Sequence, residues 1–155
     1  GLGVRPIREA ESLRTSLLAD MENSIPEAVN PQLAQKPGNL LNLEMTAEGD
    51  TASLLLCSGK ERLEVRYDRK AKRLLVLDAR GNEISRYRGS VDDVDIGDEP
   101  IRFSCYLDHS LLEVYLNNVK SVSLRNYFTE PRHFQINGNV QQLKLWEMSP
   151  AYPEN

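Results

Sequence analysis

Residues 107–118, LDHSLLEVYLNN, bring two carboxylates and an imidazole together in one short segment. Asp108 and Glu113 could act as a general acid and a general base, with His109 carrying a proton between them. Ser110 follows His109 directly, but adjacent residues on one turn cannot adopt the geometry of a serine–histidine–aspartate triad. Whether the two carboxylates can cooperate depends on the strands that position them.

The apolar residues around this segment alternate with polar ones, which predicts two paired strands. For both apolar faces to point into one core, Leu107 must lie opposite Leu112, and residues 108–111 then form a four-residue loop built around a type I turn. This register puts Asp108 in the turn and Glu113 on the outer face of the sheet. We therefore expect a structural segment and assign no catalytic residue.

The same requirement predicts the next turn. Leu116 must lie opposite Lys120, because the alternative register would bury serines, and residues 117–119 become a three-residue loop. The third residue of such a loop is usually left-handed and usually Gly, whereas here it is Val119. A β-branched residue in that conformation costs about 1–2 kcal/mol. The sequence predicts either a strained Val119 or a reshaped loop.

Four outward-facing residues form the candidate contact site for a sugar or a neighbouring domain: Tyr106, Tyr115, Glu113 and Arg125. The predicted register places Glu113 opposite Ser123 with Arg125 diagonally within reach. An ion pair between Glu113 and Arg125 on a sheet surface would contribute about 0–1 kcal/mol. The two tyrosine rings could pack against each other, against another domain, against a second copy of the chain or against a sugar.

At 155 residues the chain is long enough for one domain with a full core. Short strand-like segments, separated by turn signals and without interleaved helices, follow one another along most of it. The predicted strands are 39–47, 51–57, 61–68, 73–78, 83–88, 101–107, 111–117, 120–125, 132–136 and 140–148. This pattern predicts an all-β fold, an antiparallel two-sheet β-sandwich of the concanavalin or jelly-roll type.

The N-terminal part has a different pattern. Apolar residues at spacings of three and four predict a short helix or helical linker over residues 6–18. Prolines and a lack of periodicity predict an irregular connection over residues 20–38. We expect a linker at 1–20, a β-sandwich domain at 21–150 and a tail at 151–155.

Charge and composition exclude several classes of partner. The net charge is −4 and the pI is about 5.3, so no basic surface is expected for nucleic acid or for an anionic membrane. No apolar run approaches the ~18 residues of a spanning helix. The chain begins with Gly1, which indicates a processed protein or a piece of a longer one.

The cysteines and histidines are too few for a metal centre, and we expect no metal and no cofactor. Cys57 and Cys105 each lie in an apolar run, which favours two buried free thiols over a disulfide bond, the alternative. The acidic run DDVDIGDE, residues 92–99, lacks the ligand spacing of a calcium loop and is expected to be a solvated loop.

Three segments of the chain resemble the C-terminal β-sandwich of glycoside hydrolase family 32, the invertase, inulinase and levanase family. A family segment of the form D-R-S-S-V-E-V-F-V-N-D-G and a following T-S-R-I-Y-P element have counterparts here, as does an upstream Y-D element followed by L-x-V-D-R. The matching residues are Asp108, Ser110, Glu113, Val114, Tyr115 and Asn117, then Arg125, Asn126, Tyr127 and Phe128, and upstream Tyr67, Asp68, Leu75, Leu77 and Asp78.

Three departures mark the chain as a divergent relative. His109 stands where the family has Arg, Leu111 replaces its second Ser, and Val119 replaces the Gly of the turn. Any interaction that the family makes through that Arg is therefore not expected here.

The resemblance implies a function without catalysis in this chain. The family's chemistry lies in a five-bladed propeller with N-D-P-N, R-D-P and E-C motifs, and none of these strings occurs here. The resemblance therefore implies a domain that supports the catalytic propeller of a secreted or periplasmic hydrolase, takes part in dimerisation or borders the substrate site, and hydrolyses nothing alone. The alternative is a stand-alone, lectin-like carbohydrate-binding module.

Overall fold

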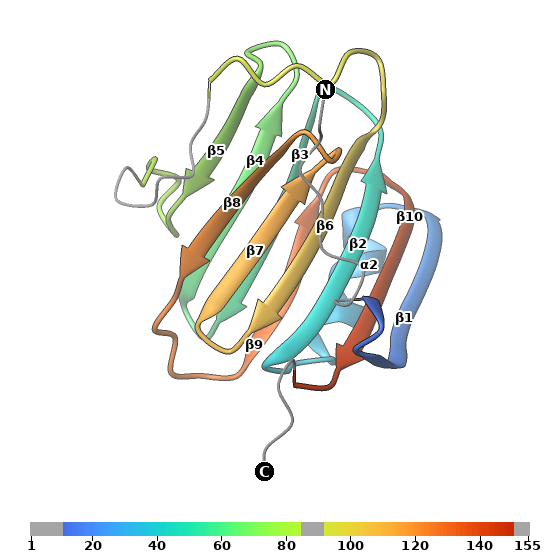
Figure 1. Ribbon diagram of the computed structural model, residues 1–155, viewed down its shortest axis with the longest axis vertical. Coiled ribbons are helices and arrows are strands. Elements are labelled where there is room, and N and C mark those ends of the chain that lie inside the picture. Colours follow the sequence, from blue (N-terminus) through green and yellow to red (C-terminus); the bar gives the residue numbers. More distant parts are fainter. Residues whose placement is uncertain (1–10, 85–91, 151–155) are drawn as a thin grey trace.

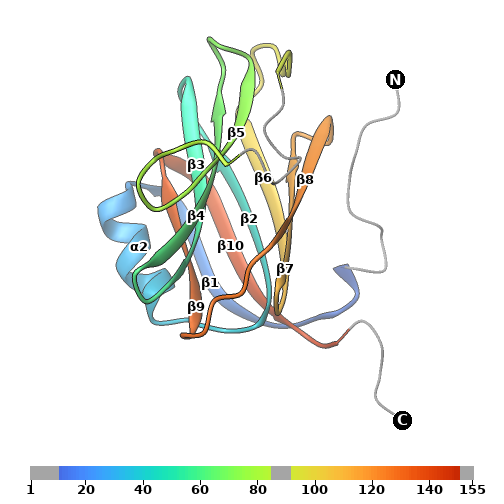
Figure 2. The same cartoon turned by 90° about the vertical axis from the view of Figure 1, so that its left-hand side faces the viewer.

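The chain folds into two packed antiparallel β-sheets, as Figures 1 and 2 show. The structure is a computed structural model that describes residues 11–84 and 92–150. The larger sheet has the strand order β1 (Arg14–Ser24), β10 (Val140–Met148), β2 (Leu40–Ala47), β6 (Ile101–Asp108), β7 (Leu111–Leu116) and β8 (Lys120–Arg125). The smaller sheet has the order β5 (Arg73–Leu77), β4 (Glu61–Asp68), β3 (Thr51–Ser58) and β9 (Arg132–Asn137). The predicted β-sandwich is confirmed.

The core lies between the two sheets. Leu43 on β2, Phe103 on β6 and Val114 on β7 face Leu56 on β3 and Phe134 on β9, and all are buried. Burying one such side chain contributes about 1.5–3 kcal/mol, so this alternation is the main determinant of the fold.

The predicted helix over 6–18 is wrong from residue 14 onward, where the chain forms β1; residues 1–10 lie outside the described part. β1 pairs with β10, and its register shifts twice, between Arg14 and Ser16 and between Leu17 and Ala19. Each shift is a bulge or irregularity that interrupts the period-two alternation of side chains. The sequence of this segment therefore lacks the alternation that predicts a strand. The extended backbone is stabilised by pairing with β10.

A helix, α2 (Pro26–Ala34), stands where an irregular connection was predicted over 20–38. Proline is tolerated in the first turn of a helix, so Pro26 does not prevent it. Val29 and Leu33, one turn apart, are completely buried. The amide of Asn30 accepts a hydrogen bond from Ile136 N at 2.8 Å and donates one to Ile136 O at 3.0 Å. The helix thus covers the outer edge of β9, at the left of the sandwich in Figure 2.

Most of the predicted strand 83–88 cannot be compared, because residues 85–91 lie outside the described part. Glu83 forms an isolated bridge with Leu77. No helix in the described residues has the length and apolar character needed to cross a membrane.

The predicted register of the β6–β7 hairpin is confirmed, since Leu107 lies opposite Leu112. The predicted four-residue loop is wrong, because Asp108 and Leu111 also pair and only two residues form the turn. His109 adopts a φ of 52°, and its N–H donates to the carbonyl of Asn39 at 2.7 Å. This contact with the start of β2 compensates for a conformation that L-residues rarely adopt.

The β7–β8 turn has the predicted register and a reshaped loop. Leu116 lies opposite Lys120. The left-handed residues are Asn117, with a φ of 47°, and Asn118, with a φ of 56°, and Val119 is not among the residues with positive φ. Asn tolerates the left-handed region better than a β-branched residue does. The two asparagines therefore take over the role of the missing Gly.

Asn118 provides a direct test of this turn. Replacing it with Ala is expected to lower the free energy of unfolding by about 1 kcal/mol, because a left-handed alanine is strained. Replacing it with Gly is expected to leave stability equal or higher. Urea unfolding of the two variants checks this, and equal stabilities would show that residue 118 is not left-handed.

Candidate functional site

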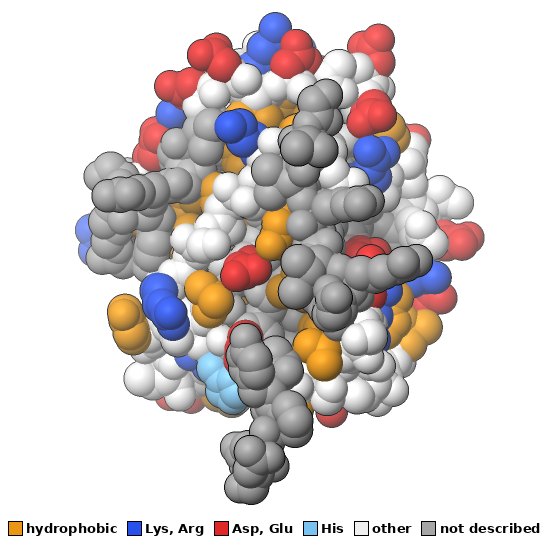
Figure 3. Space-filling model, viewed as in Figure 1, with side chains coloured by type: hydrophobic (Ala, Val, Ile, Leu, Met, Phe, Trp, Pro, Cys, Tyr) orange, Lys and Arg blue, Asp and Glu red, His pale blue; other side chains and the backbone are white. Residues whose placement is uncertain are grey.

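The strand register assembles a polar and aromatic surface on the outer face of the six-stranded sheet. One row across the strands contains Trp146 on β10, Asn42 on β2, Tyr106 on β6 and Glu113 on β7. Figure 3 shows this side of the molecule, where charged and apolar side chains are interspersed. The face is a candidate contact surface because its rows combine rings with hydrogen-bonding groups.

Three of the four predicted site residues lie together on this face. The rings of Tyr106 and Tyr115 meet edge to face, with centroids 6.3 Å apart and planes at 85°. The Tyr115 hydroxyl donates to Glu113 Oε2 at 3.1 Å. Burial, together with the negative charge of Glu113, raises the pKa of Tyr115 to about 12. The three side chains form one rigid group rather than a set of free contact residues.

The fourth predicted residue, Arg125, lies on the same face but on the edge strand β8, opposite Leu111, and its side chain turns toward the end of the sheet. Its Nη1 donates to Ser110 Oγ at 3.1 Å, in the β6–β7 turn. The ion pair predicted between Glu113 and Arg125 does not form in the described part of the chain, since Glu113 receives the tyrosine hydroxyl instead. The diagonal proximity was inferred correctly from the register, but it does not determine which way a long side chain turns.

The Tyr106 hydroxyl is the one buried side-chain polar atom without a hydrogen-bond partner among the described residues. Burial raises the pKa of this phenol, and the nearby Ser104 side chain partly offsets the rise without meeting the geometry of a hydrogen bond. Buried polar atoms are normally paired, so an unpaired one in the middle of an outer face identifies a place where a polar partner would be favourable.

A cluster around Arg14, made with Trp146, Asn42 and Glu44, was not predicted from the sequence. The Arg14 guanidinium lies 3.8 Å from the centroid of the Trp146 ring, and its Nε donates to Asn42 Oδ1 at 2.8 Å. Its Nη2 forms an ion pair with Glu44 Oε1 at 2.7 Å. The guanidinium covers one face of the indole, so Trp146 is not an open platform for a sugar. No local signal could reveal this contact, because the partners are far apart in the sequence.

The outer face contains a hollow of about 320 Å³ next to this cluster. It lies between the row that contains Lys144, Glu44 and Tyr115 and the turn after β7. The residues around it are Glu11, Glu44, Met45, Thr46, Arg102, Phe103, Ser104, Tyr115, Asn117, Asn118, Gln142 and Lys144. The formal charges of two carboxylates and two basic side chains cancel within this set.

Asp108 and Glu113 lie in separate environments. Asp108 Oδ1 lies 2.9 Å from His109 Nδ1, and both side chains are more than half exposed. Glu113 is engaged with Tyr115, and neither carboxylate borders the hollow. A catalytic pair needs a shared substrate pocket, so these two do not form one.

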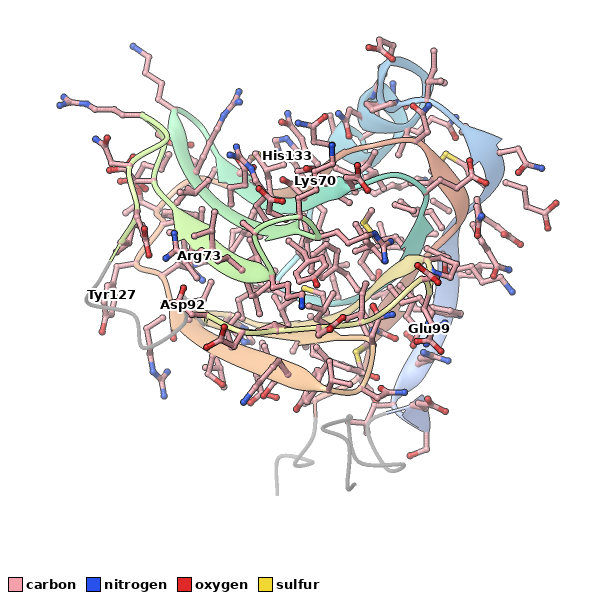
Figure 4. The ribbon with its side chains drawn as sticks, turned by 90° about the horizontal axis from the view of Figure 1, so that it is seen from above. Lys70, Arg73, Asp92, Glu99, Tyr127 and His133 are labelled. Atoms are coloured by element: carbon pink, nitrogen blue, oxygen red, sulfur yellow. The ribbon has the colours of Figure 1, made fainter. Side chains whose placement is uncertain are left out.

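The acidic loop is held by basic side chains. Asp92 pairs with Arg73 at 2.5 Å and Asp95 pairs with Lys72 at 3.3 Å; Figure 4 labels Arg73 and Asp92 side by side. A hydrogen bond from the N–H of Gly97, followed by the nearby Lys72, lowers the pKa of Asp95. Among the residues that the structure describes, no three His, Cys, Asp or Glu side chains are grouped to hold a metal ion.

Both cysteines are buried free thiols, as predicted. Cys57 lies on the outer side of β3 between His133 and Arg62, and burial raises its pKa to about 11 although Arg62 opposes this. Burial also raises the pKa of Cys105 well above its usual range. Neither thiol is therefore activated as a nucleophile.

Thiol reactivity tests this arrangement. Near pH 8 a thiol reagent is expected to modify neither cysteine in the folded chain and both after unfolding. The stability that burial confers on protonated Cys57 is present below about pH 9 and is lost as the pH rises through about 11, because the unfolded thiol ionises first. Across this pH range the free energy of unfolding, measured by chemical denaturation, should fall less steeply for Cys57→Ala than for the unmodified chain. Rapid modification of the native chain would contradict the buried placement.

The fold matches part of several solved carbohydrate-active enzymes. Sucrose-6-phosphate hydrolase from Lactobacillus gasseri matches with a TM-score of 0.67 and 19% identity over 93% of this chain and 30% of the enzyme. The GH32 β-fructofuranosidase from Bombyx mori matches with a TM-score of 0.65 and 18% identity over 98% of this chain and 31% of the enzyme. The chain thus spans about a third of the length of these enzymes.

A smaller protein has a related fold. Chicken galectin 2 matches with a TM-score of 0.52 and 9% identity over 84% of this chain and 99% of that protein. No protein-family model and no curated protein sequence matches the chain. The comparisons therefore show the fold of a β-sandwich that forms a minor part of GH32 enzymes.

Proposed function

We propose that this chain is the non-catalytic C-terminal β-sandwich domain of a glycoside hydrolase family 32-like protein and that it supports the catalytic propeller. The single observation that carries the proposal is the unequal coverage: more than nine-tenths of this chain matches less than a third of each enzyme. A fold match alone does not define activity, so the residues of the chain must support the same conclusion.

The residues that resemble the family string have tasks within the domain. The Asn117 side chain accepts from Arg102 N at 2.7 Å and donates to Pro100 O at 2.8 Å. The Asn126 amide donates to Ser110 O at 3.1 Å. These bonds tie turns and strand ends together. The string is therefore best explained as a requirement of the fold, which supports a domain without chemistry of its own.

The β1 side of the outer face of the six-stranded sheet is the proposed contact for the catalytic domain, which leaves the hollow between β10 and the β7–β8 turn open to a ligand. Glu11, which precedes β1, borders the hollow on this face, so a domain N-terminal to it would be joined here. Leu17 on β1 is 49% exposed and lies opposite Trp146 in the same sheet. The unpaired hydroxyl of Tyr106 adds a buried polar atom on that face. Together they provide the apolar and polar features of a moderate inter-domain contact.

Three measurements test the proposal. The purified chain is expected to release no product from sucrose, inulin or levan. The coding sequence upstream of Gly1 is expected to encode a propeller with the three acidic motifs, and removing residues 11–155 from that full protein is expected to lower its melting temperature. Hydrolysis by the chain alone, or a start codon directly before Gly1, would contradict the proposal.

The second candidate is the stand-alone lectin-like module, and the hollow on the outer face favours it. The volume of the hollow is within the range of about 300–1,000 Å³ that small-molecule sites occupy. The two candidates differ in whether a partner domain exists. A homodimer is a further proposal, for which β1 and β8 are the free edges of the larger sheet in the described part of the chain.

A further inference from the structure

The hollow on the six-stranded sheet has three side chains whose hydrogen-bonding groups are available. Lys144 and Gln142 on β10 and Asn118 in the β7–β8 turn all border it, and none of them has a side-chain hydrogen bond or ion pair within the described residues. They approach the hollow from two sides, because β10 and β7 are separated by β2 and β6. Donors and acceptors that converge on one hollow suit a ligand rich in hydroxyl groups.

Two further groups are held in place around the same hollow. Glu44 accepts hydrogen bonds from Arg14 at 2.7 Å and from Ser104 at 3.4 Å, and Arg102 donates to Glu99 at 3.1 Å. Side chains that are already ordered lose little entropy when they bind a ligand. Part of the polar lining is therefore preorganised.

The charges of the hollow balance. Glu11 and Glu44 contribute two negative charges, and Arg102 and Lys144 contribute two positive ones. A ligand with a net charge would meet repulsion as well as attraction here, whereas a neutral polar ligand would not. This favours an uncharged ligand over a phosphorylated one.

One wall of the hollow is aromatic. Tyr115 borders it, and the ring is fixed by its edge contact with Tyr106 and by its hydroxyl bond to Glu113. A ring held in this way presents a rigid apolar surface. A sugar has the complementary combination of hydroxyl groups on its edges and C–H groups on its faces.

We propose that this hollow binds one neutral sugar unit, with Lys144, Gln142 and Asn118 contacting hydroxyl groups and Tyr115 contacting the C–H face. The choice of sugars rests on the proposed function, whereas the site rests on the hollow itself. Binding by a single small hollow is expected to be weak, with a Kd on the order of 1 mM.

The test is a titration of the isotope-labelled chain with fructose, sucrose and 1-kestose, followed by NMR. At least one sugar is expected to give saturable shifts confined to β10, β2, β6 and the β7–β8 turn. Lys144→Met and Gln142→Ala are each expected to weaken binding about 10-fold or more, which is the effect of losing about 1.4 kcal/mol. Tyr115→Ala removes the ring and is expected to weaken binding as well.

Lys60→Met is the matched control, because Lys60 is exposed in the β3–β4 turn of the other sheet. It should bind as the unmodified chain does. Absence of saturable shifts with all three sugars, shifts centred elsewhere, or affinity unchanged in Lys144→Met and Gln142→Ala would overturn the inference. So would tighter binding of fructose 6-phosphate than of fructose. The titration needs no catalytic domain, so its failure leaves the upstream sequence to decide the proposed function separately.

Discussion

Replacing Phe103 with Ala is expected to lower the free energy of unfolding by about 3–5 kcal/mol. Phe103 is 1% exposed and lies in the middle of the larger sheet, between Met45 on β2 and Leu116 on β7. Truncation removes most of a buried ring and leaves a cavity that rigid strands cannot collapse. Since domains of this size are typically stable by about 5–15 kcal/mol, the variant should be close to unfolding. Urea unfolding measures the loss.

Leu17→Ala is the control for this substitution, because Leu17 is a large apolar residue that is 49% exposed. It is expected to change stability by less than about 1 kcal/mol. A Phe103→Ala variant that lost as little as Leu17→Ala would contradict the placement of Phe103 in the core.

Replacing Asn126 with Ala is expected to cost about 2–3 kcal/mol, because it leaves several buried groups without partners. Asn126 is 1% exposed, and its amide donates to the carbonyls of Ser110 and His109 at 3.1 and 3.5 Å. Its Oδ1 accepts from Arg132 Nε at 2.7 Å. The same guanidinium donates to the side chain of Asn39 at 3.0 Å. One amide thus connects the β6–β7 turn, the β8–β9 connection and the start of β2.

Two variants make this prediction specific. Asn126→Asp keeps the acceptor for Arg132 and loses the amide donor, so it should recover part of the stability. Tyr127→Ala changes the neighbouring side chain, which is 81% exposed and labelled in Figure 4, and should change stability by less than about 0.5 kcal/mol. Thermal unfolding of the three variants gives their order; equal losses at positions 126 and 127 would contradict the network.

The strands that were predicted correctly share one property. In β6 and β7 one face is core and the other is outer surface, so every second residue is apolar and the register follows from matching the two apolar faces. The pairing of Leu107 with Leu112 and of Leu116 with Lys120 was predicted on that basis. Where one face of a strand is buried, the alternation of apolar and polar residues identifies the side that faces the core.

The elements that were predicted incorrectly depend on contacts with distant residues. β1 is extended because it pairs with β10 more than a hundred residues later, and its register shifts remove the alternation. α2 forms because Val29 and Leu33 are buried and Asn30 bonds to β9. Local propensity is a weak term, and long-range burial overrode it in both cases.

The all-β class, the pairing around residues 101–125 and the outward position of Tyr106, Glu113 and Tyr115 follow from the amino-acid pattern alone, because a period-two pattern encodes which face is buried. Three features became visible only in the folded chain: Arg14 covers Trp146, Glu113 bonds to Tyr115, and a hollow opens beside Lys144. Side-chain direction and the space between strands depend on neighbours that are adjacent only after folding. The candidate site is made of such neighbours.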